Sequence, residues 1–163
     1  MLYSDHLVLI GSTVNYLRSI GVVVSGNFDE IADISKNIKD YYQSTKAHIL
    51  KANIYGSQSK YKSVMKELGK ANSFTNITKN KDQQYELKYL FSLLNKNLGD
   101  YQKSLKLLEE VIFYYKKKYI VDKSYENKYI LSLYAYSSGL NQLKKIDSAE
   151  IFNKRTIQLS LKS

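Results

Sequence analysis

One stretch constrains the fold more than any other part of the chain, and it reads Leu98-Gly99-Asp100-Tyr101-Gln102-Lys103-Ser104-Leu105-Lys106-Leu107-Leu108. Gly99-Asp100-Tyr101 is a turn signal, because glycine and aspartate punctuate regular structure. A small residue, Ser104, stands three positions after Tyr101, and leucines then recur at helical spacing. This pattern predicts a tight helical hairpin that turns at Gly99–Asp100.

The rest of the chain repeats the helical signal. Apolar residues recur at three- and four-residue steps, as in a helix that buries one face. No proline interrupts the 163 residues, which suits long helices. We therefore expect an all-α protein with eight helices, at about residues 4–24, 28–40, 42–55, 60–73, 83–98, 101–121, 125–143 and 146–162. The polar segment Thr75–Asp82 has no apolar periodicity, and we predict a loop there.

An internal repeat emerges when the residues that follow each predicted turn are aligned. These are Phe28, Tyr61, Tyr101 and Ile146, and three positions later stand Ile31, Val64, Ser104 and Ala149. The spacings are 33, 40 and 45 residues, close to the period of helix–turn–helix repeats but uneven. Stacked helix pairs bury apolar faces that neither helix can bury alone. We predict one domain over residues 1–163, with approximate pairs at 4–40, 42–74, 83–121 and 125–162.

These features resemble the tetratricopeptide repeat (TPR) family, and residues 87–104 carry the resemblance best. The pair from Ala47 to Ala71 keeps Ala52, Tyr55 and Tyr61 in matching roles, and residues 133–157 keep Ser137, Leu140 and Ala149. The first pair matches only through Gly26-Asn27-Phe28. No proline closes a repeat, and the later units exceed the usual length of about 34 residues. The resemblance implies antiparallel helix hairpins in a right-handed α-solenoid.

The run from Lys144 to Arg155 is similar in style to TPR regions of bacterial regulatory and sensor proteins, and intracellular peptide-pheromone receptors are similar at the same level. Such arrays precede a membrane helix and an output domain, so this chain would then be a fragment of a longer one. Its location stays open: cytoplasmic for a standalone protein, periplasmic for part of a membrane-anchored regulator. The short apolar runs at 7–10 and 22–24 are far from a spanning segment.

Charge introduces a second function class. The net charge of +10 comes almost entirely from lysine, since the only arginines are Arg18 and Arg155. Lysine on solvated helix surfaces explains this charge better than a nucleic-acid surface, which favours the arginine fork. The 16 tyrosines leave base stacking open, although half-buried packing is the simpler interpretation. The alternative function is a basic helical repeat that binds nucleic acid. Because arginine is scarce, we do not expect a nucleic-acid partner.

Catalysis, metal and cofactor binding have little support. The chain has no cysteine, and its two histidines, His6 and His48, have no second ligand at metal-binding spacing. We interpret His48 as a polar residue on a helix face. The seven glycines stand singly rather than in a phosphate-binding loop. We predict a non-enzymatic protein without a cofactor or metal.

A protein- or peptide-binding groove is the leading function. In TPR arrays the first helix of each pair lines the concave face, so the resemblance places nine residues there: Lys46, Ile49, Asn53, Lys88, Ser92, Asn95, Tyr134, Ser138 and Asn141. Lysine would supply charge for a carboxylate, and asparagine can pair with an extended backbone. The alternative is that these are ordinary solvent-facing residues.

The last predicted helix is unusually apolar, with Ile151, Phe152, Ile157, Leu159 and Leu161. A terminal repeat needs a polar outer face. We therefore expect either that the natural chain continues or that this helix associates with a second subunit.

Overall fold

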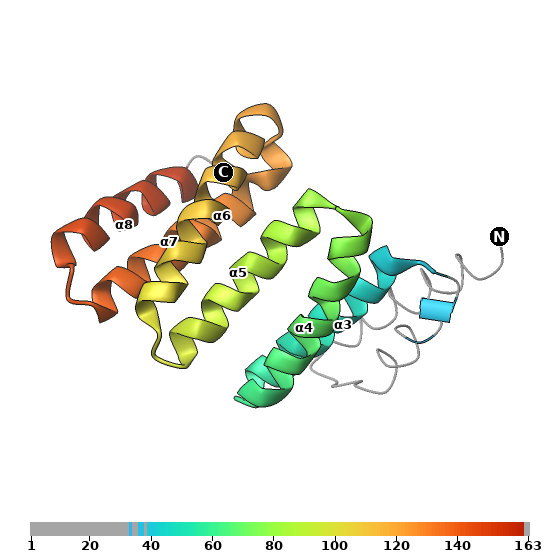
Figure 1. Cartoon of the computed structure of the whole chain (residues 1–163). Helices are drawn as coiled ribbons and strands as arrows, with labels where there is room; N and C mark the ends of the chain where they lie inside the picture. The colour runs from blue at the N-terminus through green and yellow to red at the C-terminus, as the bar shows by residue number, and fades with distance from the viewer. Residues whose placement is uncertain (1–32, 34–35, 38, 162–163) are drawn as a thin grey trace. The chain divides into compact units, whose positions relative to one another are not determined.

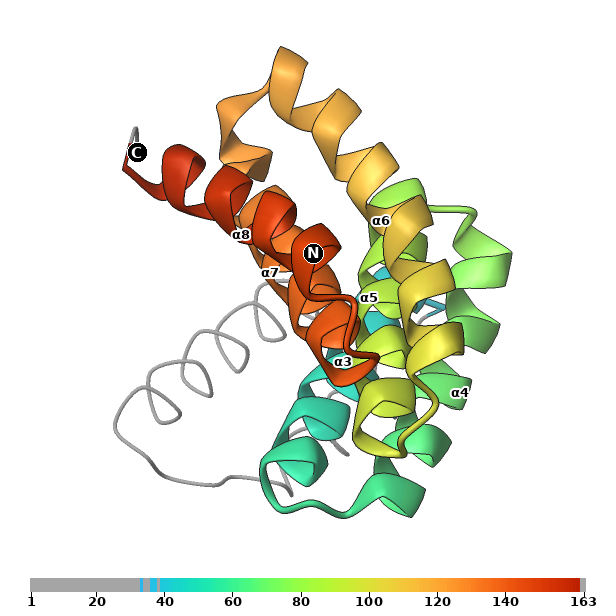
Figure 2. The ribbon, with the colours of Figure 1, turned by 90° about the vertical axis from the view of Figure 1, so that its left-hand side faces the viewer.

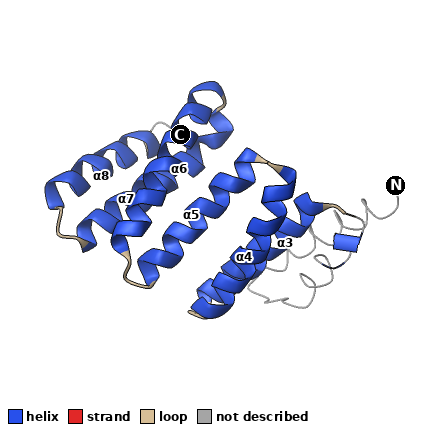
Figure 3. Cartoon of the chain, in the orientation of Figure 1, coloured by secondary structure: helices blue, strands red, loops and turns tan. Residues whose placement is uncertain are grey.

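The computed structural model describes residue 33, residues 36–37 and residues 39–161. Over these residues the fold is all-α, as predicted, with six α-helices, a short 3-10 turn and no strand (Figures 1 and 3). The helices are α3 (Tyr41–Ser57), α4 (Tyr61–Thr78), α5 (Lys81–Asn97), α6 (Tyr101–Val121), α7 (Glu126–Gln142) and α8 (Ile146–Ser160). The predicted helix at 4–24 and the turn at Gly26–Phe28 lie outside the described residues.

The chain divides into two compact units between Gln84 and Tyr85, inside α5. In the N-terminal unit α3 and α4 pack along each other. The small residues Ala47 and Ala52 of α3 and Ala71 of α4 are buried. Leu68 of α4 is fully buried as well. The two helices thus form one closely packed hairpin.

The predicted loop over Thr75–Asp82 is wrong, because α4 continues to Thr78 and α5 begins at Lys81. Thr75 is buried, and its hydroxyl donates to the carbonyl oxygens of Ala71 and Asn72 at 3.2 and 2.9 Å. Thr75 thus continues the buried series of Val64, Leu68 and Ala71 at helical steps, with a polar residue in a core position. Lys79 adopts a left-handed conformation that ends α4. Asn80 then caps α5 by accepting the backbone N–H of Gln83 at 3.0 Å.

The C-terminal unit is built on α7, which packs against both α6 and α8. Figure 2 shows α7 and α8 side by side. Its core contains Val111 and Tyr115 of α6, Tyr129 and Leu133 of α7, and Leu159 of α8. A second cluster joins Leu105, Leu140 and Ala149. Each of the three helices therefore contributes its apolar face to one interior.

Three hairpin turns have the same backbone geometry. The residue in the left-handed region is Ser59, Gly99 or Lys144. The next residue donates its N–H back to a carbonyl five positions earlier, in the pairs Lys60–Tyr55, Asp100–Asn95 and Lys145–Leu140, at 2.9, 2.9 and 3.0 Å. This is the Schellman arrangement that ends a helix. The following residue starts α4, α6 or α8, and these starts at Tyr61, Tyr101 and Ile146 match the alignment of predicted turns.

The residues three positions after each of these starts, Val64, Ser104 and Ala149, are all buried. They lie on the first turn of α4, α6 and α8, where a small side chain allows close packing. None of the described helices is both long enough and apolar enough to span a lipid bilayer.

Candidate functional site

The nine predicted groove residues differ widely in their surroundings. On α3, Lys46 is exposed with its ammonium 4.7 Å from the centre of the Tyr42 ring, and Asn53 is half-buried. On α7, Tyr134 and Asn141 are exposed and Ser138 is half-buried. On α5, Lys88 forms an ion pair with Glu110 of α6. These six side chains keep some surface that a ligand can reach.

Two of the nine are interior residues. Ile49 of α3 is buried, and Ser92 is fully buried with its hydroxyl donating to the carbonyl of Tyr89 at 2.6 Å. A ligand in an open groove would not reach them. Asn95 is half-buried, and its side-chain amide donates a hydrogen bond to the carbonyl of Phe91 at 2.7 Å. A shift of one residue moves a side chain by about 100° around a helix, so the sequence alone did not separate interior from groove positions. As ligand contacts, the other residues stay predictions.

The C-terminal unit has a groove that the sequence did not reveal. It is a hollow of about 450 Å³ lined by α6, α7 and α8. Ile112, Tyr129, Leu133 and Phe152 give it an apolar lining. The volume falls in the range of about 300–1,000 Å³ that ligand pockets occupy. None of the nine predicted residues lines this groove, because finding it required the phase of α8 against α6 and α7.

The groove also has a cationic border. Lys116 of α6 and Lys154 and Arg155 of α8 line it, together with the exposed Ile151. Lys154 forms an exposed ion pair with Glu150 at 2.7 Å, and this contact lowers the pKa of the Glu150 carboxyl. Exposed pairs of this kind contribute little to stability and are easily exchanged for another partner. The border therefore suits an anionic segment next to an apolar side chain.

Tyrosines of the same unit are engaged with one another and with lysines. Tyr85 of α5 stacks on Tyr114 of α6, with ring centres 3.8 Å apart and planes 5° from parallel. Lys118 lies over the rings of Tyr114 and Tyr125, and Lys123 lies 3.8 Å from the centre of the Tyr119 ring. Such contacts stabilise the fold by about 0.5–1 kcal/mol each at exposed sites. Ring faces used in this way are not open for stacking on bases.

A cluster of charged side chains is buried in the N-terminal unit. Glu67 of α4 lies at its centre, with its carboxylate 2.7 Å from His48 Nδ1, 3.8 Å from Lys51 Nζ and 3.4 Å from Lys70 Nζ. His48, Lys51 and Glu67 are all buried. Ionic groups removed from water require partners of this kind. The cluster therefore links α3 to α4 through charge as well as apolar contact.

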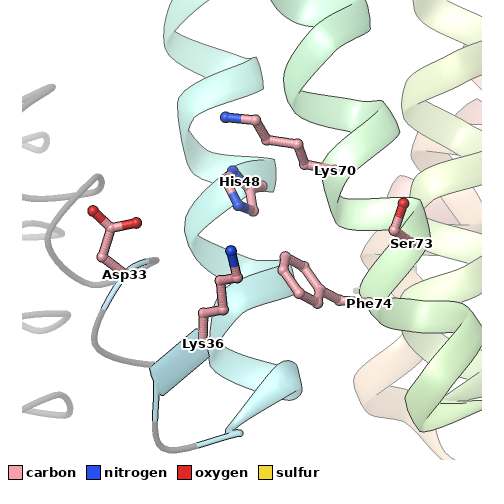
Figure 4. A pocket seen from close by; sticks show the side chains of 6 residues that line it. All are labelled: Asp33, Lys36, His48, Lys70, Ser73 and Phe74. Atoms are coloured by element: carbon pink, nitrogen blue, oxygen red, sulfur yellow. The ribbon is translucent and has the colours of Figure 1, made fainter.

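A cavity of about 240 Å³ opens beside His48. Its lining comprises Asp33, Lys36, His48, Lys70, Ser73 and Phe74 (Figure 4). The Phe74 ring stacks on the imidazole, with centres 5.8 Å apart, and on the ring of Tyr41. Burial lowers the pKa of His48, and the hydrogen bond with Glu67 opposes that effect in part. Because Nδ1 is held by Glu67, Nε2 is the nitrogen through which this histidine can exchange a proton with a ligand.

The sequence analysis interpreted His48 as a polar residue on a helix face, and the structure buries that face of α3, with the ring against Glu67 of α4. The sequence carried only a weak signal for this charged cluster. His48 and Lys51 are three residues apart and share a helix face, but their partner Glu67 lies 19 residues beyond His48 on another helix. Pairing them needs the register of α3 on α4. In the described part of the chain, no three His, Asp or Glu side chains gather as metal ligands would.

Comparison with protein-family models, with curated proteins and with solved structures yields no significant match to this chain.

Proposed function

We propose that this chain is a non-enzymatic, TPR-like helical-repeat module that binds a protein or peptide segment. The groove among α6, α7 and α8 carries the proposal. It joins an apolar lining to a border of cations, the combination that holds an extended or helical peptide by side-chain anchors. The occupant that fits is a segment with acidic residues next to a large apolar side chain.

The recurrent turn supports the repeat. Three turns with one hydrogen-bond pattern precede α4, α6 and α8, and a buried residue follows at the same offset each time. Local geometry that recurs along a chain is what a stack of related hairpins requires. A right-handed solenoid and a role in a bacterial regulatory or sensor protein rest on the TPR resemblance.

Selection of ligands from a random peptide library on the immobilised protein tests the proposal. We expect enriched peptides to carry Asp or Glu beside Leu, Phe or Ile. Titration of one such peptide, followed by fluorescence anisotropy, should show that the double variant K116E/R155E loses at least about tenfold in affinity, or about 1.4 kcal/mol. The matched control K106E changes an exposed lysine of the same helix, α6, that does not line the groove.

The proposal is overturned if K106E loses as much peptide affinity as K116E/R155E does. It is also overturned if the enriched peptides show no preference for acidic or apolar residues. A single-stranded oligonucleotide in the same assay tests the nucleic-acid alternative. Phosphate-driven affinity falls steeply as salt rises, whereas an apolar anchor in a groove is much less sensitive. Strong oligonucleotide binding with a steep salt dependence would replace the peptide proposal.

A further inference from the structure

We propose that the C-terminal end of α6 is a membrane-contact surface, at which exposed apolar side chains enter an anionic lipid bilayer and the lysines around them bind the lipid headgroups. This surface, the α6 tip, comprises Phe113, Lys117, Ile120 and Val121 of α6 and Lys123 of the 3-10 turn η1 (Lys123–Tyr125). Figures 1 and 2 both show this end of α6 and the turn after it extending past the end of α8. The α6 tip therefore lies at an extremity of the C-terminal unit.

The apolar side chains of the α6 tip expose most of their surface to solvent. Phe113, Ile120 and Val121 are 62%, 69% and 89% exposed. At about 100° per residue, Ile120 lies about 20° and Val121 about 80° from Phe113 around the helix axis. The three side chains thus form one apolar strip. Transfer of this strip from water into a lipid environment is favourable, because it removes apolar area from water.

Lysines surround the apolar strip. The ammonium of Lys117 lies 4.3 Å from the centre of the Phe113 ring, and that of Lys123 lies 3.8 Å from the centre of the Tyr119 ring. A contact with a ring leaves the full charge on the ammonium. A lysine can also extend its flexible stem along apolar surface and keep its charged end in water. These lysines can therefore reach lipid headgroups while their apolar neighbours enter the bilayer.

The charge of this region stays positive when its carboxylates are counted. Residues 113–128 include four exposed lysines, Lys116, Lys117, Lys123 and Lys128, and in the described part of the chain none of the four forms an ion pair. The carboxylates of the same segment are Asp122 and Glu126. Lys118 has other partners in the fold and is left out of the count. Four lysines against two carboxylates leave an excess of two positive charges.

The next carboxylate back along α6 does not cancel this excess. Glu110 forms an ion pair with Lys88 of α5. It lies ten residues before Ile120, or about 15 Å along the helix axis at about 1.5 Å per residue. That distance exceeds the Debye length of about 8 Å at physiological ionic strength. The α6 tip therefore presents its own lysines to an anionic surface.

An anionic bilayer fits the α6 tip better than the other possible occupants do. A second copy bound symmetrically would place the same lysines opposite one another, and like charges repel. A nucleic acid would contact the lysines through its phosphates and leave Ile120 and Val121 without an apolar partner. A bilayer accepts both groups, since its headgroups attract basic residues and its acyl boundary takes apolar ones. Because few side chains enter, the contact is peripheral and reversible.

A single tryptophan in the full chain reports on this contact. The natural sequence has no tryptophan, so I120W and the control I77W each introduce the only one. Ile77 of α4 is 57% exposed and lies in the N-terminal unit. We would add vesicles of phosphatidylglycerol mixed with phosphatidylcholine, or of phosphatidylcholine alone. We expect the emission of I120W to shift to the blue, and to be quenched by brominated lipid, only with the vesicles that contain phosphatidylglycerol. I77W should show neither change.

Co-sedimentation with the same anionic vesicles measures the affinity of variants without tryptophan. I120S/V121S should lower the affinity by at least about tenfold, because two apolar side chains no longer enter the bilayer. K117Q/K123Q should lower it by at least about fivefold, through loss of attraction to the headgroups. The matched control K103Q/K106Q removes two exposed lysines from the first turns of the same helix and should leave affinity unchanged. All of these variants keep Lys116, so the border of the groove is unaltered.

Several results would overturn the proposal. It fails if the anionic vesicles do not bind the wild-type chain, if I77W shifts as much as I120W, or if K103Q/K106Q weakens binding as much as K117Q/K123Q. A blue shift of I120W that grows with protein concentration in the absence of vesicles would assign the α6 tip to a second copy. Tighter binding to a single-stranded oligonucleotide than to vesicles, weakened by K117Q/K123Q and not by I120S/V121S, would assign it to nucleic acid.

Discussion

His48 Nδ1 lies 2.7 Å from Glu67 Oε2, and the two residues are 6% and 4% exposed. The pair joins the middle of α3 to the first half of α4. Because both side chains are withdrawn from water, each depends on the other for its compensating interaction. Glu67 has a larger role than His48, since Lys51 and Lys70 also lie within 4 Å of its carboxylate.

Removal of Glu67 should therefore be costly. We expect E67A to lower the free energy of unfolding by about 3–5 kcal/mol, because it removes the carboxylate that pairs with the buried His48 and Lys51. The control E110A breaks the exposed ion pair with Lys88 and should cost no more than about 1 kcal/mol. Urea denaturation followed by circular dichroism measures both. Equal effects in the two variants would contradict a structural role for the buried cluster.

The low pKa of His48 predicts a pH-dependent stability. Burial holds the pKa of His48 in the folded state below its unfolded value of about 6.5. At pH values between these two pKa values, the unfolded chain therefore binds more protons than the folded one. Stability is then complete above about pH 6.5 and is lost as pH falls toward the folded-state pKa. Unfolding free energies at pH 5.5 and 7.5 should show this loss in the wild type and in H6Q. In H48Q the difference between the two pH values should shrink, and an unchanged difference would refute the assignment.

The helices were predictable where local signals sufficed. Gly99-Asp100-Tyr101 is a turn in the structure, and α6 begins at Tyr101 as expected. The turns at Ser59 and Lys144 were placed by the helix starts that follow them, although neither has a glycine in the left-handed position. The helical nature of 75–78 was missed because Thr75 occupies a core position that polar composition conceals.

Tertiary features were harder to predict, for a physical reason. The His48–Glu67 pair and the groove bordered by Lys116 and Arg155 join side chains from different helices. Their proximity depends on the rotation of each helix and on the register of one helix against another. Periodicity gives the rotation only within about one residue, or about 100°. Hence Ile49 and Ser92, assigned to an open groove, lie in the interior instead.

The shared turn geometry predicts opposite effects of glycine and alanine. Gly99 has φ +83°, whereas Ser59 and Lys144 hold φ +55° and +57° with side chains that disfavour this region. We expect G99A to destabilise the chain by about 1 kcal/mol, and S59G and K144G each to stabilise it by up to about 1 kcal/mol. Thermal unfolding of the three variants provides the measurement. A loss of stability in both S59G and K144G would mean that those side chains make contributions that outweigh the strain.

Two helical glycines should respond differently to alanine. A Cβ on Gly139 of α7 would lie 2.9 Å from Cδ2 of Leu105, a buried residue of α6, whereas a Cβ on Gly69 of α4 would meet nothing within 4 Å. G69A should gain about 0.5–1 kcal/mol from helix propensity alone. G139A should lower the free energy of unfolding by about 1–3 kcal/mol through overpacking. The helix-propensity gain of about 0.5–1 kcal/mol offsets part of that loss. Chemical denaturation distinguishes the two, and a stabilising G139A would show that Leu105 moves aside without cost.

The outer face of α8 predicts self-association. Ile146, Ile157 and Leu161 are 59%, 58% and 82% exposed, and at 3.6 residues per turn they fall within about 60° of one another around the helix axis. Ile151 lies on a different side and lines the groove. Glu150 lies in the same sector between Ile146 and Ile157, so Ile157 and Leu161, about one turn apart, form the apolar surface that a partner would cover. We expect the full chain to dimerise at high protein concentration, as measured by light scattering coupled to gel filtration.

The double variant I157K/L161K should abolish the dimer. The variant I151K should leave the dimer intact while it weakens peptide binding in the groove. A wild type that stays monomeric at every concentration, or a dimer that survives I157K/L161K, would rule out α8 as the contact.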